Sequence, residues 1–316
     1  MKNDLPIKLK LPDGFFDEEI RCGYTVSSDM KAVWAVELDL LYQFQKVCKK
    51  YKLTYFADGG TMLGAIRHNG FIPWDDDIDV MMMRSEYEKL CEIAPCEFES
   101  PYFFQTEYTD PSSLRGHAQL RNSLTTAILK EESDVSRFFN QGIFIDIFPI
   151  DSVPDNKVDF EKKVKQANFY LSKAKNLASF SDAYKPTING GKFKHRLKEL
   201  IHYLSRTVLK PFFNYDLFYR KYEEACKKYN DKNSLKVAKF FCIPVAKNQI
   251  WFREDFETID EVPFEMISID IPCGYHRILD IFFGTDWSIP KRIETVHSDV
   301  IFDPYKPYFY YLEEYK

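Results

Sequence analysis

The sequence predicts an α/β fold in which a mixed sheet is flanked by helices, and three observations support this prediction. In several segments apolar residues recur every three or four positions, which is typical of helices with one buried face. Between these segments lie short apolar runs of strand length, bounded by Gly, Pro or Asp. The chain has 316 residues, of which 45% are hydrophobic and 29% charged, so it can bury a large core. The alternation of strands and helices indicates an α/β core over residues 30–155.

In chain order, the predicted elements are a helix over residues 32–51, a strand over 53–57, a helix over 61–67, a strand over 77–83, a helix over 84–93 and a strand over 142–148. The first helix carries an apolar stripe that includes Val33, Val36 and Leu40, with acidic residues early and lysines late, as the helix dipole favours. The short strand after it ends at the Gly59–Gly60 turn, where the second helix begins.

The remaining core elements follow from prolines and apolar runs. Pro73 prevents the second helix from continuing, and the acidic-headed run that follows has the composition of a buried strand. The run 142–148 is a second buried strand, which we expect to end at Pro149 before a loop that contains Asp151 and Pro154.

Residues 156–316 are predicted to form an accessory region that completes the fold and binds the acceptor. Its first part, 160–230, is rich in Lys and helical in pattern, with a loop at 184–191, and we interpret it as a helical insertion or second lobe. The chain ends in an aromatic tail over 303–315.

Charge and cysteine content exclude several classes of protein. The 48 acidic and 43 basic residues leave a net charge of −5, so we expect no nucleic acid partner. The seven cysteines are scattered without the spacing of a metal site or disulfide framework, which indicates reduced thiols.

No apolar stretch approaches the ~18 residues of a membrane span, and the first residues do not resemble a signal peptide. We therefore expect a cytoplasmic protein.

Four carboxylates fall within five positions, at Asp75, Asp76, Asp77 and Asp79. A solvated surface loop is one explanation, because water and cations screen like charges there. A calcium loop is another, since three of these residues and Glu86 have its ligand spacing, although its turn glycine is missing. The sequence alone leaves both explanations open.

A third explanation is a catalytic site for a divalent cation. Asp77 and Asp79 would project from the same face of a strand, because side chains alternate along it. Asp146 is a lone carboxylate in the second apolar strand, and a buried carboxylate must be paired or neutralised. If the two strands are neighbours, the three carboxylates converge and suit one or two Mg²⁺ ions, or Mn²⁺, and a substrate phosphate.

Other side chains near this cluster suit the rest of a nucleotide substrate. Gly59 and Gly60 let the backbone approach a ligand closely, and the N-terminus of the next helix can donate N–H groups to phosphate. Arg67 is a candidate for bidentate phosphate binding, and Arg121 is a second candidate.

At these residues the sequence resembles the LicD family of phosphocholine transferases, a branch of the nucleotidyltransferase superfamily to which fukutin and the fukutin-related protein also belong. The resemblance is carried by YFADGGTMLGAIR at residues 55–67 and GFIPWDDDIDV at 70–80. The segment GIFIDIFPID at 142–151 resembles the second acidic signature of the family. The clear similarity covers about residues 30–155.

The resemblance implies a nucleotidyltransferase-like fold and a Mg²⁺-dependent enzyme that moves phosphocholine from CDP-choline to a sugar hydroxyl, releasing CMP. The acceptor would be a precursor of lipopolysaccharide, teichoic acid or capsule. Asp77 and Asp79 would be metal ligands, and Asp146 would be a third ligand or the general base, with Asp76 as the second candidate base. The candidate substrate-binding residues are Gly59, Gly60, Thr61, Arg67, Trp74, Asp75, Asp76, Arg121 and Asp151.

Two alternatives to this function stay open. A transferase of the same fold could use CDP-ribitol, CDP-glycerol or a phosphoethanolamine donor, and a non-catalytic module could bind only metal or nucleotide.

The basic amphipathic stretch 192–210 predicts either a helix with a solvated basic face or peripheral contact with the inner face of the membrane, where a lipid-linked sugar acceptor would lie.

Overall fold

The computed structural model describes residues 5–111, 113–129, 139–182, 215–230, 234–241, 243–292 and 300–314. Its strands are β1 (Glu19–Arg21), β2 (Tyr24–Val26), β3 (Phe56–Ala57), β4 (Asp79–Met83), β5 (Tyr102–Gln105), β6 (Ala118–Asn122), β7 (Thr126–Leu129), β8 (Ile143–Val153), β9 (Lys236–Ala238), β10 (Ile250–Phe252), β11 (Ile259–Phe264), β12 (Ile267–Pro272) and β13 (Val300–Asp303). Its helices are α1 (Ser28–Tyr51), α2 (Gly59–His68), α3 (Arg84–Glu97), α5 (Lys157–Asp182), α7 (Tyr215–Lys227), α8 (Ile243–Asn248), α9 (Tyr275–Phe283) and α10 (Tyr308–Glu314). These elements confirm the predicted α/β class.

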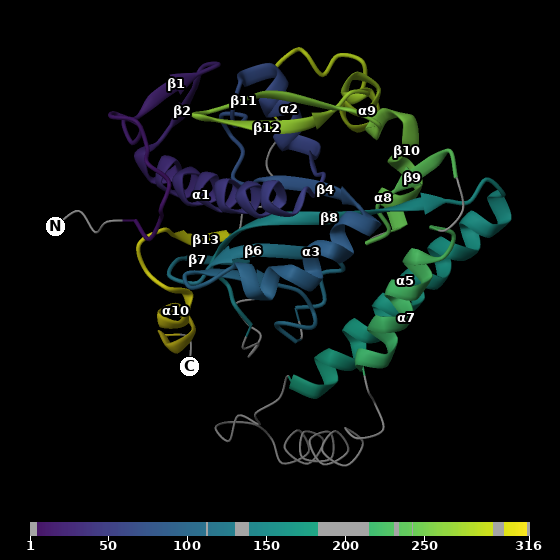
Figure 1. Ribbon diagram of the computed structural model, residues 1–316. Coiled ribbons are helices and arrows are strands. Elements are labelled where there is room, and N and C mark those ends of the chain that lie inside the picture. Colours follow the sequence, from purple (N-terminus) through teal and green to yellow (C-terminus); the bar gives the residue numbers. More distant parts are fainter. Residues whose placement is uncertain are drawn as a thin grey trace, which may run out of the picture.

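A mixed sheet lies at the centre of the molecule (Figure 1). Its strand order is β10-β9-β8-β4-β3, while β6 also pairs with β8 and β5 pairs with β6. Strands β4 and β8 run parallel, and the other pairs in this sheet are antiparallel. The long strand β8 therefore links β4 on one side to β6 and then β9 on the other.

The helix α1 packs against β6 and β8, and α3 packs against β4 and β8. The helix predicted over 32–51 is confirmed, and it begins earlier because the Ser27 hydroxyl accepts a hydrogen bond from the Met30 N–H at 3.2 Å. It ends at Lys52, which adopts the left-handed conformation with φ +54°. The helices predicted at 61–67 and 84–93 are also present, as α2 and α3.

The predicted strand end at Pro149 was wrong, because β8 continues to Val153. The Asp146 N–H donates to the Ile78 carbonyl at 2.9 Å, on the β4 side. Since N–H groups alternate between the two sides of a strand, position 149 faces away from β4. On that side the pairing of β8 with β6 ends at Ile147, and its pairing with β9 begins at Asp151. The missing N–H of Pro149 therefore lies in the gap between these two partner strands.

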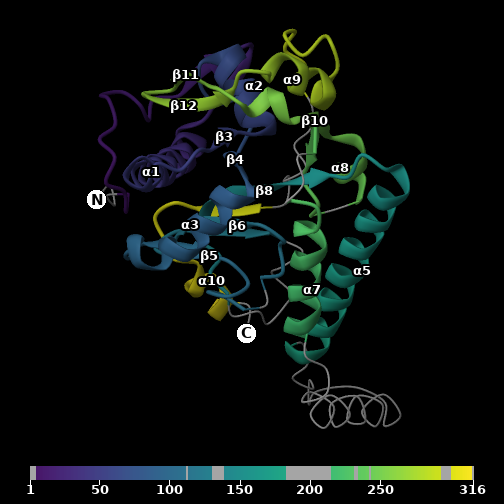
Figure 2. The same cartoon turned by 45° about the vertical axis from the view of Figure 1, so that its right-hand side comes forward.

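Helices α5 and α7 lie side by side and project from one end of the sheet (Figures 1 and 2). Their buried residues form an apolar cluster that is separate from the main core around α1 and the sheet. The two helices confirm the helical pattern predicted over 160–230 for the part of it that the structure describes. The loop predicted at 184–191 and the basic stretch at 192–210 lie outside the described residues.

Elements from beyond residue 155 also join elements of the predicted core. Strands β9 and β10 extend the central sheet, and β13 pairs with β7. The aromatic tail contributes α10. The division at residue 155 remains a prediction. Over the described ranges, no helix combines the length and the apolar composition needed to cross a membrane.

Candidate active site

Asp79 and Asp146 occupy partner positions on the parallel strands β4 and β8. Side chains at partner positions of adjacent strands project from the same face of the sheet, so the two carboxylates lie side by side. The sequence analysis expected the carboxylates to converge only if their two strands are neighbours, and β4 and β8 are neighbours. Asp77 lies just before β4 rather than within it, but its charge acts strongly on Asp79.

The glycine turn lies against these carboxylates. The Asp58 N–H donates to the Asp79 carbonyl at 3.0 Å, and the Thr61 hydroxyl accepts from the Asp79 N–H at 2.8 Å. Gly59 has φ +45°, which favours glycine, and a Cβ atom on it would lie 3.9 Å from Asp79 Oδ2. A Cβ atom on Gly60 would lie 2.6 Å from Asp75 Oδ2. The start of α2 thus faces two carboxylates without intervening side chains.

Asp75, Asp76 and Asp77 place one carboxylate oxygen each within 4.8 Å of one another. Asp76 is buried and the other two are half-buried, which does not fit a fully solvated loop. The following residues form β4, so a calcium-binding helix-loop-helix does not form, and Glu86 instead accepts from the Thr54 N–H at 3.2 Å.

Helix α1 adds a further carboxylate that the sequence analysis did not select. The Trp34 indole N–H donates to the Asp75 carbonyl at 3.0 Å. One turn later, Glu37 is only 1% exposed. Burial, and then the nearby charges of Asp77 and Asp76, raise the pKa of Glu37 well above its usual range. The detectable signal was an acidic residue within the apolar stripe of a helix.

The environments of Asp79 and Asp146 differ. Burial, followed by the charges of Asp77 and Asp146, raises the pKa of Asp79 well above its usual range. For Asp146 burial is the largest single influence and acts in the same direction, but His117 and Gln119 outweigh it and lower the pKa. His117 Nε2 lies 3.2 Å from Asp146 Oδ1, and the Gln119 amide donates to the same oxygen. Asp146 is therefore the better-fixed carboxylate.

A buried ion pair joins the site to the second half of the chain. Lys239 Nζ binds Asp58 Oδ2, and both side chains are buried. Nothing in the local sequence around Lys239 indicated this contact, because the two residues are 181 positions apart. His117 and Gln119 were also missed, since only the pairing of β6 with β8 brings them to Asp146.

These residues fit a divalent cation. Carboxylate oxygens are the ligands that Mg²⁺ and Mn²⁺ prefer. Within the described ranges, Glu37 Oε2 and Asp58 Oδ1 are buried and have no hydrogen-bond partner. Buried oxygens beside several like charges are costly unless a cation or proton compensates them. Asp77, Asp79 and Asp146 stay the predicted ligands.

Residues 52–181 match the sequence profile of the family described as LicD/FKTN/FKRP, nucleotidyltransferase domain. The matched range contains the glycine turn, the acidic cluster and Asp146. Residues 52–181 are therefore similar to this LicD-family domain. Lys239 lies outside the range that matches the LicD profile.

Two curated relatives illustrate the similarity. The chain is 26% identical over 261 residues to the lipopolysaccharide cholinephosphotransferase LicD of Haemophilus influenzae, which covers 81% of this chain and 90% of that protein. It is also 41% identical over 63 residues to an uncharacterized protein of Rickettsia prowazekii, covering 19% of this chain and 23% of the relative. The first similarity extends well beyond the LicD domain.

Arg67 and Trp74 both lie near Asp75, whose charge acts on Arg67. Arg67 donates to His68 Nε2 at 2.9 Å and to the Trp287 carbonyl at 2.8 Å, and burial lowers its pKa. Trp74 directly precedes the acidic cluster and packs edge to face against Tyr24, with ring centroids 6.1 Å apart. Both residues are half-buried.

Two predicted substrate-binding residues make buried contacts with other side chains. Arg121 is buried in β6 and donates to the Gln105 side chain at 2.6 Å and the Gly142 carbonyl at 2.7 Å. It also donates to the Gln119 side chain, which in turn binds Asp146. Asp151 lies five residues beyond Asp146 on β8. Both of its oxygens accept from the Arg84 guanidinium, at 2.8 and 2.6 Å. The structure does not bring Asp151 to the carboxylate cluster that contains Asp79 and Asp146.

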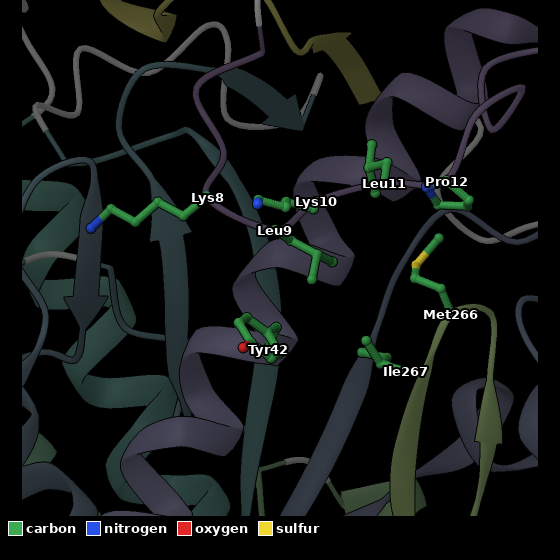
Figure 3. Close-up of a pocket in the computed structure, with 8 residues that line it drawn as sticks. All are labelled: Lys8, Leu9, Lys10, Leu11, Pro12, Tyr42, Met266 and Ile267. Carbon is green, nitrogen blue, oxygen red and sulfur yellow. The ribbon is translucent and has the colours of Figure 1, made fainter.

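The structure also has a surface groove of about 640 Å³ (Figure 3). It runs between the N-terminal segment, α1 and the turn from β11 to β12. Its lining residues are Lys8, Leu9, Lys10, Leu11, Pro12, Tyr42, Met266 and Ile267. None of these is a predicted site residue, and none is acidic. The groove therefore lacks the ligands that a divalent-cation site needs.

Proposed function

We propose that this chain transfers phosphocholine from CDP-choline to a sugar hydroxyl of a cell-surface glycan precursor, releasing CMP, with Mg²⁺ or Mn²⁺ as cofactor. The observation that carries the proposal is the pairing of Asp79 with Asp146 beside the Gly59–Gly60 turn, in a LicD-family domain. The similarity to a relative named as a cholinephosphotransferase supports phosphocholine as the transferred group and lipopolysaccharide as the class of acceptor.

Each group of residues has a distinct part in this proposal. A divalent ion held by Asp77, Asp79 and Asp146 would neutralise the negative charge of the diphosphate. Gly59 and Gly60 leave room for the diphosphate at the start of α2, where backbone N–H groups are available. Asp146 is fixed by two donors to one oxygen, which leaves its second oxygen for this ion.

In the proposed reaction the acceptor hydroxyl oxygen attacks the phosphorus that carries choline. A new phosphorus–oxygen bond forms, and the bond from that phosphorus to the oxygen of CMP breaks. The hydroxyl proton passes to a carboxylate of the cluster, for which Asp76 is the better candidate than the strongly fixed Asp146. Positioning and electrostatics supply most of the catalysis in phosphoryl transfer of this kind.

Choline carries a permanent positive charge, which aromatic faces bind well. Trp74 and Tyr24 meet edge to face next to the acidic cluster and are the proposed contacts for this group. A CDP-ribitol or CDP-glycerol donor would not need these rings. The residues after 155 are proposed to bind the acceptor, and contact with the inner face of a membrane would bring a lipid-linked acceptor to the site.

The proposal is tested by measuring CMP release from CDP-choline, CDP-ethanolamine, CDP-ribitol and CDP-glycerol, with lipopolysaccharide precursor as acceptor and with Mg²⁺ or EDTA. We expect Mg²⁺-dependent release from CDP-choline. Asp77→Asn should reduce the rate by about 100-fold or more, equivalent to about 2.7–4 kcal/mol, as for other single electrostatic contacts in active sites. Asp155→Asn, an exposed aspartate outside the site, is the matched control.

Three results would change the proposal. Release from another donor alone would reassign the alcohol. Near-normal turnover by Asp77→Asn would remove that residue from the site. Binding of metal and nucleotide without release from any donor would favour a non-catalytic module.

A further inference from the structure

Lys239 lies over the face of β8 that carries Asp146. Its ammonium is 4.6 Å from the ring centre of Phe148, which is two residues beyond Asp146. Residues two apart on a strand project from the same face and are separated by ~7 Å. The Lys239 ammonium is therefore close to the carboxylate cluster, although Lys239 directly follows β9, in the second half of the chain.

The surroundings of Lys239 keep its charge in place. The rings of Trp251, Phe282 and Phe241 lie 5.7, 5.4 and 5.9 Å from the ammonium, in addition to that of Phe148. Aromatic faces stabilise a cation, and burial prevents water from screening it. The charge of Lys239 consequently acts on its neighbours over a longer range than that of an exposed lysine.

The carboxylate that Lys239 binds belongs to the residue just before the glycine turn. Asp58 Oδ2 contacts the ammonium, whereas Asp58 Oδ1 is buried and has no hydrogen-bond partner within the described part of the chain. The backbone of Asp58 also binds Asp79, through an N–H to carbonyl bond of 3.0 Å. Asp58 thus connects Lys239 to the turn and to a proposed metal ligand.

We infer that Lys239 is a positioning residue that, through Asp58, holds the glycine turn against β4 and sets the charge balance of the carboxylate cluster for a divalent cation and a nucleoside diphosphate. The inference rests on the proposed function, in which that cluster holds the cation. Lys239 does not touch the reacting atoms. Its charge weakens cation binding and strengthens diphosphate binding, and Asp58 offsets both effects.

An electrostatic role predicts opposite changes in the affinities for Mn²⁺ and for CDP, whereas a purely structural role does not. Asp58→Asn leaves the Lys239 charge uncompensated, so we expect Mn²⁺ to bind about three- to tenfold more weakly, because like charges repel. The double variant Asp58→Asn/Lys239→Met restores a neutral pair of similar shape. Its Mn²⁺ affinity should return to within about twofold of the wild-type value. CDP binding in EDTA should shift in the opposite direction for Asp58→Asn.

The experiment is a Mn²⁺ titration of the full chain followed by electron paramagnetic resonance, with circular dichroism to verify folding and Asp155→Asn as control. The inference is overturned if the double variant binds Mn²⁺ as weakly as Asp58→Asn, or if neither differs from wild type. If Asp58→Asn does not fold, Lys239→Met replaces it. That variant must then bind Mn²⁺ more tightly than the double variant, and equal or weaker binding overturns the inference.

The titration contains no donor and no acceptor. Failure of CDP-choline turnover would leave the inference standing, whereas normal turnover with unchanged Mn²⁺ affinities would overturn the inference alone. Absence of Mn²⁺ binding in the wild type would overturn both.

Discussion

Individual aspartates in this chain have different environments despite similar local sequence. Asp146 and Asp151 lie on the same strand within the second acidic segment, but only Asp146 faces Asp79. Asp151 is 1% exposed and binds Arg84 and the Asn230 amide. Buried ion pairs of this kind are costly to break, because the remaining charge stays buried. Residue type and spacing alone do not distinguish a ligand from a structural carboxylate.

Asp151→Asn therefore tests whether this residue binds substrate or stabilises the fold. We expect the free energy of unfolding to fall by about 3–5 kcal/mol, as for other broken buried pairs. Turnover per folded molecule should change little. Urea denaturation measures the first quantity, and steady-state kinetics at a temperature below the transition measures the second. A selective rise in KM with unchanged stability would instead support substrate binding.

At the scale of elements, pairing between strands decides which side chains meet. The hairpin of β11 and β12 places Asp270 directly opposite Glu261. Burial, and then the charge of Glu261, raises the pKa of Asp270 to about 6. Like charges at opposed positions of an antiparallel pair are destabilising. This hairpin therefore carries an internal repulsion at neutral pH.

The sign of the resulting pH dependence follows from this raised pKa. Above pH 6 the folded protein must hold a charged Asp270, whereas below its unfolded pKa of about 4 both states are protonated and the cost disappears. Asp270→Asn should stabilise the protein by about 0.5–1 kcal/mol at pH 7.5, the size of a cross-strand pair. The gain should vanish near pH 4. Thermal unfolding of both proteins at the two pH values measures it, and an equal gain at both would rule out this cause.

At the scale of the whole molecule, the proposed site depends on segments that are far apart in the sequence. Each of the following contributes at least one side chain to it: helix α1, the residues beside the glycine turn, β4, β6, β8 and the residue that follows β9. Several of these side chains are buried carboxylates with like charges nearby, as shown by the raised pKa values of Glu37 and Asp79. A ligand that neutralises them binds only the folded state and should stabilise the entire chain.

Metal addition should therefore raise the melting temperature. At a Mg²⁺ concentration 100 times its dissociation constant, the expected stabilisation is about 2.7 kcal/mol. Asp79→Asn should lose most of this increment, while Asp155→Asn should keep it. Differential scanning calorimetry with Mg²⁺ or EDTA measures the effect. A similar rise in both variants would place the ion outside the proposed site.

The sequence by itself determined the fold class, the main helices, the resemblance to a known family and the acidic segments, because these depend on local periodicity and on contiguous motifs. It left open whether the strands of Asp79 and Asp146 are neighbours, which the pairing of β4 with β8 decided. Only the tertiary structure decided the contacts of Lys239, His117 and Glu37, the continuation of β8 through Pro149, and the separation of Asp151 from the site. These depend on strand register and on pairing between distant segments, which no single stretch of sequence encodes.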